Sequence, residues 1–304
     1  MSRCQRLPTT RRSGVFKVPG RDQPRAITAD QPAVKVSPWK TCKVDEILPG
    51  GVANAGAVIR RGEFVLRPSN PHSEAIHAFL RELRSTGFAG ASLPVEIQAD
   101  GHERLVFIDG DVPVPPFPEW AQSDDTLASI AQLMRRFHEA SSQLPTGDGP
   151  WNNELADPAG GPMICHNDVC LENVVFRNGR AVGLLDFDFA APGRPIFDLA
   201  AFARMCVPID DDLNAGRLGF GLLDRPGRLR LVADTYGLEA EGRSELVHHL
   251  DRSMRGGGEF VQRRVDSGDA NFIRMFEEMG GMERYDRRLR WWEEDRESFV
   301  KALA

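Results

Sequence analysis

Three side chains with oxygen donors stand at fixed spacings in the middle of this 304-residue chain. Asp168 precedes Asn173 by five residues, and Asp186 follows after a largely apolar stretch. Phosphoryl transfer requires an acceptor hydroxyl that is positioned and relieved of its proton, and Mg²⁺ held against a triphosphate. An aspartate suits the first task, while an asparagine and a second aspartate supply the hard oxygen ligands that magnesium prefers. Each residue alone would more often be structural, but the combination indicates phosphoryl-transfer chemistry.

Short apolar segments that we predict to be strands surround these three residues. Residues 163–165 lead into the first aspartate, and residues 174–176 and 181–185 flank the dipeptide Asn178-Gly179. Asn-Gly is the dipeptide that tight hairpins favour. Because a hairpin brings its two ends together, we expect the asparagine before it and the second aspartate after it to lie close together.

The remaining pattern predicts an α+β fold with two lobes. Before Gly110, alternating apolar residues predict a small antiparallel sheet. One helix interrupts this sheet; Asn70-Pro71 offers its cap and Gly87 ends it. After a proline-rich connector over 112–118, residues 124–144 have the apolar stripe of an amphipathic helix. From Ile196 onward the pattern is mainly helical. The expected strands of the sheet are 44–48, 57–59, 64–66, 95–98 and 105–108.

The motifs together resemble a known family. His166 through Asn173 reads H-x-D-x-x-x-x-N, and two predicted strands and an aspartate follow, which is the layout of the kinase signature set. Residues 186–188 read Asp-Phe-Asp, and residues 192–200 match a G-x-P-x-x-D-L-A run. The chain thus resembles the aminoglycoside phosphotransferase and choline kinase-like (APH) family over roughly residues 43–304.

The resemblance implies a two-lobed protein kinase-like fold and an ATP-dependent phosphotransferase. It implies that Asp168 is the catalytic base and that Asn173 and Asp186 bind Mg²⁺. The acceptor would be a small molecule with a hydroxyl group, such as an aminoglycoside-like antibiotic or an amine- or sugar-type metabolite. Three further residues would have supporting roles in packing, in the catalytic loop or at a second metal: His166, Asp188 and Asp198.

The nucleotide-binding half has weaker signals. Gly50 and Gly51, followed by Gly56, stand where a loop would cover the phosphates of ATP, because glycine lets backbone N–H groups approach closely. A plain strand turn explains these glycines nearly as well. Residues 107–110 resemble the hinge between the lobes of the family, where backbone groups near Ile108 would meet adenine.

The expected phosphate-binding lysine is absent. No lysine lies between Lys43 and Lys301, and the matching strand offers Arg67 instead. An arginine keeps the charge and can bind phosphate through two N–H groups, although it is not interchangeable with lysine. Its acidic partner stays open between Glu74 and Glu82, both on the following predicted helix.

Charge and cysteine usage limit the possible partners and the compartment. Residues 1–40 have nine Lys/Arg against two Asp and are predicted to be a disordered basic tail, so the rest of the chain has a net charge of −13. An acidic body disfavours nucleic acid and weakly favours a cationic acceptor, for which Asp210-Asp211-Asp212 is one candidate; a solvated acidic loop is the commoner role. The five cysteines form no CxxC pair, which predicts neither a disulfide framework nor a zinc site.

No apolar run approaches the roughly 20 residues of a membrane span, and no apolar stretch follows the paired arginines at 11–12 as an export signal requires. These features predict a cytoplasmic protein without a membrane partner. We expect residues 41–110 to form the nucleotide-binding lobe and residues 111–304 the catalytic and acceptor-binding lobe.

A second function remains open: a catalytically weak pseudokinase, or an immunity-type binding protein, with the same fold. Arg67 in place of lysine favours it, whereas the intact trio of Asp168, Asn173 and Asp186 argues against it. A protein kinase is disfavoured, since the chain has Asp-Phe-Asp instead of Asp-Phe-Gly and lacks an Ala-Pro-Glu segment.

Overall fold

The computed structural model describes residues 45–48 and 56–304. All of them belong to one unit that spans Lys43–Ala304. The predicted tail over 1–40 and the two predicted loop glycines, Gly50 and Gly51, lie outside the described residues.

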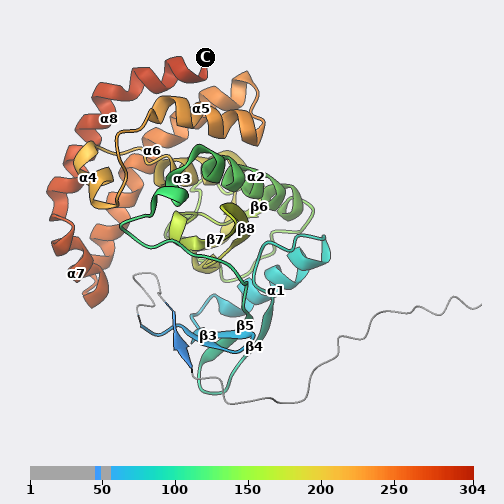
Figure 1. The fold of residues 1–304 in the computed structure, drawn as a ribbon. Helices are drawn as coiled ribbons and strands as arrows, with labels where there is room; N and C mark the ends of the chain where they lie inside the picture. The colour runs from blue at the N-terminus through green and yellow to red at the C-terminus, as the bar shows by residue number, and fades with distance from the viewer. Residues whose placement is uncertain (1–44, 49–55) are drawn as a thin grey trace, which may run out of the picture. The chain divides into compact units, whose positions relative to one another are not determined.

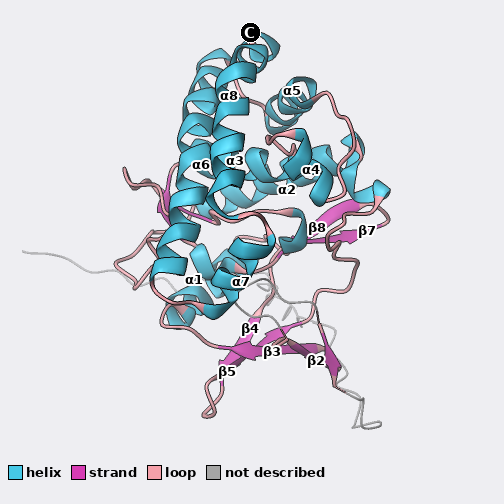
Figure 2. Ribbon diagram, turned by 90° about the vertical axis from the view of Figure 1, so that its left-hand side faces the viewer, coloured by secondary structure: helices cyan, strands magenta, loops and turns pink. Residues whose placement is uncertain are grey.

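The N-terminal part is a five-stranded antiparallel sheet, as predicted, with strand order β1-β2-β3-β5-β4. Figure 2 shows β2 to β5 side by side. Alternation along β5 buries Glu103 and Leu105 on one face, while their neighbours are less buried. The strands are β1 (Glu46–Ile47), β2 (Ile59–Arg61), β3 (Phe64–Pro68), β4 (Pro94–Ile97) and β5 (His102–Val106).

Helix α1 (Ser73–Ser85) packs with this sheet through its buried apolar stripe, which includes Ile76 and Leu80. The helix begins two residues after the predicted Asn70-Pro71 start, and its N-cap is His72. The reason is local: the side-chain oxygen of Asn70 accepts a hydrogen bond from the N–H of His72 at 2.8 Å, which forms a turn ahead of the helix. Gly87, with φ +94°, follows the helix end as predicted.

The C-terminal part is mainly helical (Figure 1). Helix α2 (Asp124–Ser141) is capped by Ser123, whose side chain accepts from the N–H of Thr126, and its apolar stripe is buried in the main core. The other helices are α3 (Pro195–Cys206), α4 (Asp212–Arg217), α5 (Arg225–Tyr236), α6 (Ala240–Asp266), α7 (Ala270–Glu278) and α8 (Gly281–Leu303). None of the helices in the described ranges is long and apolar enough to cross a membrane.

Two small strand pairs lie between the sheet and these helices. Strand β6 (Met163–Cys165) pairs with β9 (Ala191–Gly193), and β7 (Val174–Arg177) pairs with β8 (Arg180–Leu184). The predicted Asn178-Gly179 turn joins the second pair; both residues have positive φ, +51° and +72°, as a type I′ hairpin turn requires. The result is a two-lobed α+β fold in which this hairpin leads directly into the site.

Candidate active site

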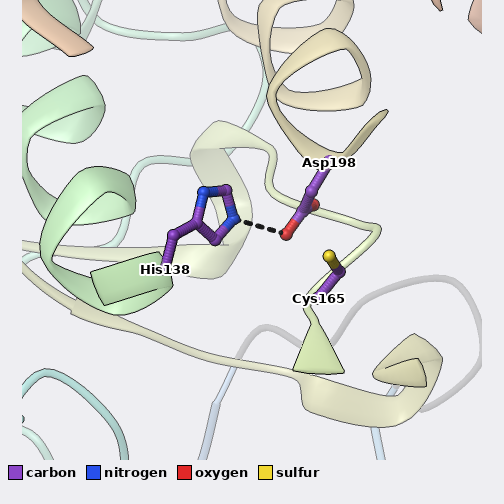
Figure 3. A group of neighbouring side chains, drawn as sticks. All are labelled: His138, Cys165 and Asp198. Atoms are coloured by element: carbon purple, nitrogen blue, oxygen red, sulfur yellow. Dashed lines mark hydrogen bonds and ion pairs between the residues drawn. The ribbon is translucent and has the colours of Figure 1, made fainter. Parts of the chain in front are cut away.

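Asp198, in the first turn of α3, holds the loop after β6 in place. Its two carboxylate oxygens accept hydrogen bonds from the backbone N–H groups of His166 and Asn167, each at 2.8 Å. His138 of α2 lies 3.0 Å from the same carboxylate (Figure 3). Although burial opposes ionisation of Asp198, its hydrogen bonds with the His138 ring and with the backbone N–H of His166 lower its pKa. This geometry fits the expected role of Asp198 as a support for the loop.

His166 is fully buried and belongs to the same support. Its Nε2 donates to the carbonyl oxygen of Leu185 at 2.8 Å, and its Nδ1 accepts from the N–H of Asp168 at 3.3 Å. The two bonds together require a neutral ring, and burial lowers the pKa of His166 accordingly. The ring also packs against Phe187, with centroids 4.5 Å apart. His166 thus ties the loop to the end of β8.

Asp168 and Asn173 face each other across the short helical turn Leu171–Asn173. The Asn173 side-chain amide donates to the carbonyl oxygen of Asp168 at 2.9 Å and to its carboxylate at 3.3 Å. Burial and the negative charge of Asp186 raise the pKa of Asp168 to about 8, against the opposing charge of Arg204. The three predicted residues are therefore close enough to influence one another.

Asp186 follows β8 in a left-handed conformation, with φ 61° and ψ 65°. One of its carboxylate oxygens accepts from Nη1 of Arg67 at 2.8 Å, and Asp188 accepts from Nη2 of the same arginine at 2.6 Å. Although burial opposes its charge, Arg67 has its pKa held above the ordinary value by Asp188, Asp186 and Glu103. Burial raises the pKa of Asp188 to about 6 despite this partner. Arg67 thus links β3 to the loop after β8.

The acidic partner of Arg67 within the sheet is Glu103, and neither candidate on the helix takes that place. Glu103 stands directly opposite Arg67 in the register of β3 and β5 and accepts from its Nε. His77 of α1 contacts the other oxygen of Glu103 at 2.6 Å. Glu74 and Glu82 are exposed on the outer side of α1, because the apolar stripe turns His77 toward the sheet.

The structure describes only some of the other residues that were predicted for the nucleotide site. Ile108 lies two residues after the end of β5, and a Cβ at Gly183 of β8 would come within 3.0 Å of its side chain. Ile108 therefore lies beside the hairpin that positions Asp186. Gly50 and Gly51 lie outside the described residues, while Gly56 occupies a turn before β2 with φ +75°.

The donor atoms around Asp186 suit Mg²⁺. Arg67 occupies one carboxylate oxygen each of Asp186 and Asp188, and Asn173 donates through its nitrogen. The second oxygens of the two carboxylates and the amide oxygen of Asn173 form no hydrogen bond with any other described residue. These are hard oxygen donors of the kind that magnesium prefers. By contrast, in the buried group His138, Cys165 and Asp198 the carboxylate is already bonded to His138 and to the backbone of the loop after β6.

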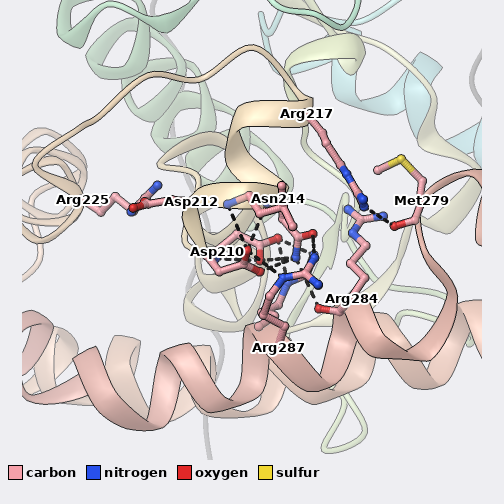
Figure 4. A network of polar contacts seen from close by, with 11 residues as sticks. Asp210, Asp212, Asn214, Arg217, Arg225, Met279, Arg284 and Arg287 are labelled. Atoms are coloured by element: carbon pink, nitrogen blue, oxygen red, sulfur yellow. Dashed lines mark hydrogen bonds and ion pairs between the residues drawn. The ribbon is translucent and has the colours of Figure 1, made fainter.

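Two of the three acids after α3 differ from both expectations, while the third, Asp212, is exposed. Asp210 and Asp211 are buried, so they do not form a solvated loop. Asp210 accepts from Arg288 at 2.8 Å and Asp211 from Arg287 at 3.0 Å, both from α8 (Figure 4). Burial without these arginines would leave uncompensated charges. The two acids are thus already neutralised within the protein.

Sequence comparison places the chain in a family. Residues 151–232 match the model of a family described as "Phosphotransferase enzyme family", the stretch that contains Asp168 and Asp186. The trifolitoxin immunity protein of Rhizobium leguminosarum bv. trifolii is 34% identical over 213 residues, which are 68% of this chain and 79% of that protein. The chain belongs to this phosphotransferase family.

Two solved structures have the same fold as this chain. A choline/ethanolamine kinase family protein from Mesorhizobium loti superposes with a TM-score of 0.58 at 16% identity, over 86% of this chain and 92% of that one. The GDP and kanamycin complex of APH(2″)-IIIa gives a TM-score of 0.51 at 15% identity, over 80% of this chain and 94% of that one. The predicted two-lobed fold is confirmed.

Sequence analysis did not identify four residues as part of the site: His77, Glu103, His138 and Arg204. A signal was present for three of them. An acidic residue on the buried face of a strand marks Glu103, but the predicted strand began at 105 and excluded it. A histidine at helical spacing within an apolar stripe marks His77 in α1 and His138 in α2. No local pattern points to Arg204.

Proposed function

We propose that this chain is an ATP-dependent phosphotransferase that moves the γ-phosphoryl group of Mg-ATP to a hydroxyl group of a small molecule. The proposal rests chiefly on one observation: Asp168, Asn173 and Asp186 converge on a loop that Asp198 holds in place. Family membership supports the same reaction class.

In the proposed reaction the acceptor oxygen forms a bond to the γ-phosphorus, and the bond from that phosphorus to the β–γ bridging oxygen breaks. ADP leaves, and the hydroxyl proton passes to the carboxylate of Asp168. A general base is most effective when its pKa lies near the working pH. The pKa of Asp168, raised to about 8 first by burial and then by Asp186, meets that condition.

The nucleotide would lie between the sheet and the hairpin. Asn173 and Asp186 would hold Mg²⁺, with Asp188 beside them; when bound, the ion neutralises charge on the triphosphate. Arg67 has a fork of N–H donors that suits phosphate oxygens, and it already lies on the two aspartates. Backbone groups near Ile108, and the loop with Gly50 and Gly51, would complete the site. That APH(2″)-IIIa was solved with GDP makes GTP a second nucleotide to test.

We further propose that residues 41–110 form the nucleotide-binding lobe and residues 111–304 the catalytic and acceptor-binding lobe. A cytoplasmic location agrees with the cysteines that the structure describes, Cys165, Cys170 and Cys206, which are free thiols.

A second candidate is an immunity-type binding protein without turnover. The trifolitoxin immunity protein, by its name, confers immunity, and it is 34% identical to this chain. The ion pairs of Arg67 with Asp186 and Asp188 favour this candidate too, because a guanidinium on these carboxylates competes with a metal ion.

Isothermal titration calorimetry tests the proposal directly. We expect saturable binding of ATP that depends on Mg²⁺, and a loss of that dependence in Asp186→Ala. The exposed Asp148 provides a matched control, since Asp148→Ala lies outside the site. If neither ATP nor GTP binds at millimolar concentration to the folded wild-type protein, the phosphotransferase proposal fails and the binding-protein candidate takes its place.

A further inference from the structure

A buried histidine of α1 is connected to the candidate nucleotide site through hydrogen bonds. His77 is 2% exposed and lies in the apolar stripe of α1, and its Nε2 is 2.6 Å from Oε2 of Glu103. The other oxygen of Glu103 accepts a hydrogen bond from Nε of Arg67. The guanidinium of Arg67 in turn donates to Asp186 and Asp188. One chain of hydrogen bonds therefore runs from α1 through β5 and β3 to the two aspartates after β8.

Glu103 is held at both carboxylate oxygens, each by a different element. Although burial opposes its ionisation, the hydrogen bond from His77 and the charge of Arg67 lower the pKa of Glu103. An ionised carboxylate only accepts hydrogen bonds, so Nε2 of His77 carries the donated proton. A carboxylate with one partner can rotate about its terminal bond, whereas partners at both oxygens fix its plane. His77 thus determines the orientation in which Glu103 receives Arg67.

Strand pairing places Glu103 where it can hold Arg67 from the side. The two residues stand directly opposite each other in the register of β3 and β5, so their side chains lie on the same face of the sheet. The neighbours of Glu103 along β5, His102 and Arg104, lie on the other face and are partly exposed. Of these three residues of β5, alternation leaves Glu103 between α1 and Arg67.

Arg67 uses three of its five N–H groups on carboxylates. Nε donates to Glu103, Nη1 to Asp186 at 2.8 Å and Nη2 to Asp188 at 2.6 Å. Each Nη nitrogen has a second N–H group, which forms no hydrogen bond with another described residue. The planar fork of a guanidinium suits phosphate oxygens only when its plane is correctly oriented. The bond from Nε to Glu103 therefore fixes where the two remaining N–H groups point.

Helix α1 also contacts the loop that holds the two aspartates. The ring of Phe79 lies 6.5 Å from the ring of Phe187, measured between centroids, and Phe187 is the residue between the two aspartates. Both rings are buried in the main core. The contacts through His77 and through Phe79 thus begin on one helix and end at the same loop. A helix with both contacts keeps Arg67 and that loop at a fixed separation.

We propose that His77 is a positioning residue for nucleotide binding: it fixes Glu103, which orients the remaining N–H groups of Arg67 toward the phosphates of Mg-ATP. The inference rests on the proposed phosphotransferase function and deepens it, because it names the residues that let an arginine serve where a lysine was expected. The same arrangement gives the buried carboxylate of Glu103 two partners, where an unpaired charge would be costly. His77 does not touch the nucleotide; it acts through the other two residues.

Two substitutions of His77 separate positioning from packing. His77→Gln keeps an N–H donor at a reach similar to that of the imidazole Nε2, whereas His77→Phe keeps a ring but has no donor. We expect His77→Phe to weaken Mg-ATP binding on the order of 10-fold in calorimetry, the effect of one lost hydrogen bond to a charged group, and His77→Gln to stay within about threefold of wild type. A packing role predicts the opposite order, with phenylalanine tolerated and glutamine damaging.

A double-mutant cycle shows whether His77 acts through Arg67. In the Arg67→Met background, His77→Phe should have no further effect on Mg-ATP affinity, because the residue that it positions is gone. An undiminished effect in that background would contradict the proposed route. His102→Phe is the matched control: it makes the same change next to Glu103 on the exposed face of β5 and should leave the affinity unchanged.

Nuclear magnetic resonance of nucleotide-free protein measures the position of Arg67 without any ligand. The Nε–H resonance of Arg67 is assigned by its absence in Arg67→Met. This proton should exchange slowly with water in wild type and in His77→Gln, and on the order of 10-fold faster in His77→Phe, where its acceptor is no longer fixed. Should His77→Phe fail to fold, Glu103→Gln keeps the size of the side chain, removes its charge and should cause the same changes in exchange and in affinity.

Two results overturn the inference: equal exchange rates of this proton in wild type and His77→Phe, or a measurable Mg-ATP affinity that is equal in the two proteins. The same values decide for Glu103→Gln. If wild type binds neither ATP nor GTP but the exchange rates differ as expected, the phosphotransferase function is refuted, and the positioning of Arg67 by His77 stands. The two proposals thus fail separately.

Discussion

Replacement of Arg67 by methionine would remove the central cation between the sheet and the site. Arg67 is 11% exposed and is paired with Glu103, Asp186 and Asp188, which are 1%, 27% and 17% exposed. Methionine keeps much of the side-chain volume but leaves three carboxylates close together without their shared partner. Breaking a buried ion pair by removing one partner costs about 3–5 kcal/mol. We expect a loss of this size in the free energy of unfolding of Arg67→Met at pH 8.

The loss should depend on pH in a defined direction. The pKa of Asp188 is about 6 in the folded protein, raised by burial even with Arg67 in place. A carboxyl group whose pKa is raised by folding costs stability as the pH rises through the interval between its unfolded and folded pKa values. Without Arg67, the pKa of Asp188 rises further, so protonation at pH 5 relieves part of the repulsion. The difference between wild type and variant should therefore be smaller at pH 5 than at pH 8.

Urea unfolding at both pH values measures these differences. Arg104→Met is the matched control, because Arg104 lies on the neighbouring strand β5 in a surface ion pair with Glu96. Loss of such a pair lowers the free energy of unfolding by about 1 kcal/mol or less. A loss for Arg67→Met below about 1 kcal/mol at pH 8, or a loss that does not change with pH, would refute the electrostatic role assigned to Arg67.

Four further predictions concern the site. In nucleotide-free protein, Arg67→Met should bind Mn²⁺ more tightly than wild type, as judged by electron paramagnetic resonance, since the guanidinium no longer occupies the two aspartates; equal affinity would contradict the competition. Asp168→Asn should lower transfer by about 10²- to 10⁴-fold in an ADP-release assay while ATP affinity stays within twofold. Wild-type kcat/KM should rise with pH up to about 8, because the pKa of Asp168 is raised to that value and the ionised form acts as base; a profile flat from pH 6 to 9 would count against Asp168 as the base. Asp198→Asn leaves one of two backbone N–H groups without its carboxylate acceptor and should cost about 1–3 kcal/mol in urea unfolding; unchanged stability would show that the loop is held by other contacts.

Local sequence patterns were sufficient to predict the hairpin and the buried face of α2. The Asn178-Gly179 turn needs positive φ at both positions, and that requirement is satisfied within four residues of chain. It brings Asn173 and Asp186 to the two ends of one hairpin, so their proximity could be predicted. The buried stripe of α2 likewise follows from spacing alone.

The strand boundaries were predicted less accurately, and the misplaced start of β5 caused the partner of Arg67 to be missed. Placing the start of β5 at 105 instead of His102 hid Glu103 on the strand opposite Arg67. Its partner was then sought on the following helix. Strand register depends on pairing with a distant segment, which the local sequence does not specify.

The sequence by itself led to the prediction of which residues would perform phosphoryl transfer. It also determined that Asp168, Asn173 and Asp186 lie near one another, because short-range turns connect them. The tertiary structure decided the charges around them. Arg67 reaches aspartates 119 and 121 residues away, and the acids after α3 pair with arginines of α8 more than 70 residues later. Ion pairs depend on distance in space and on burial, so the partners of these acids could be found only from the folded chain.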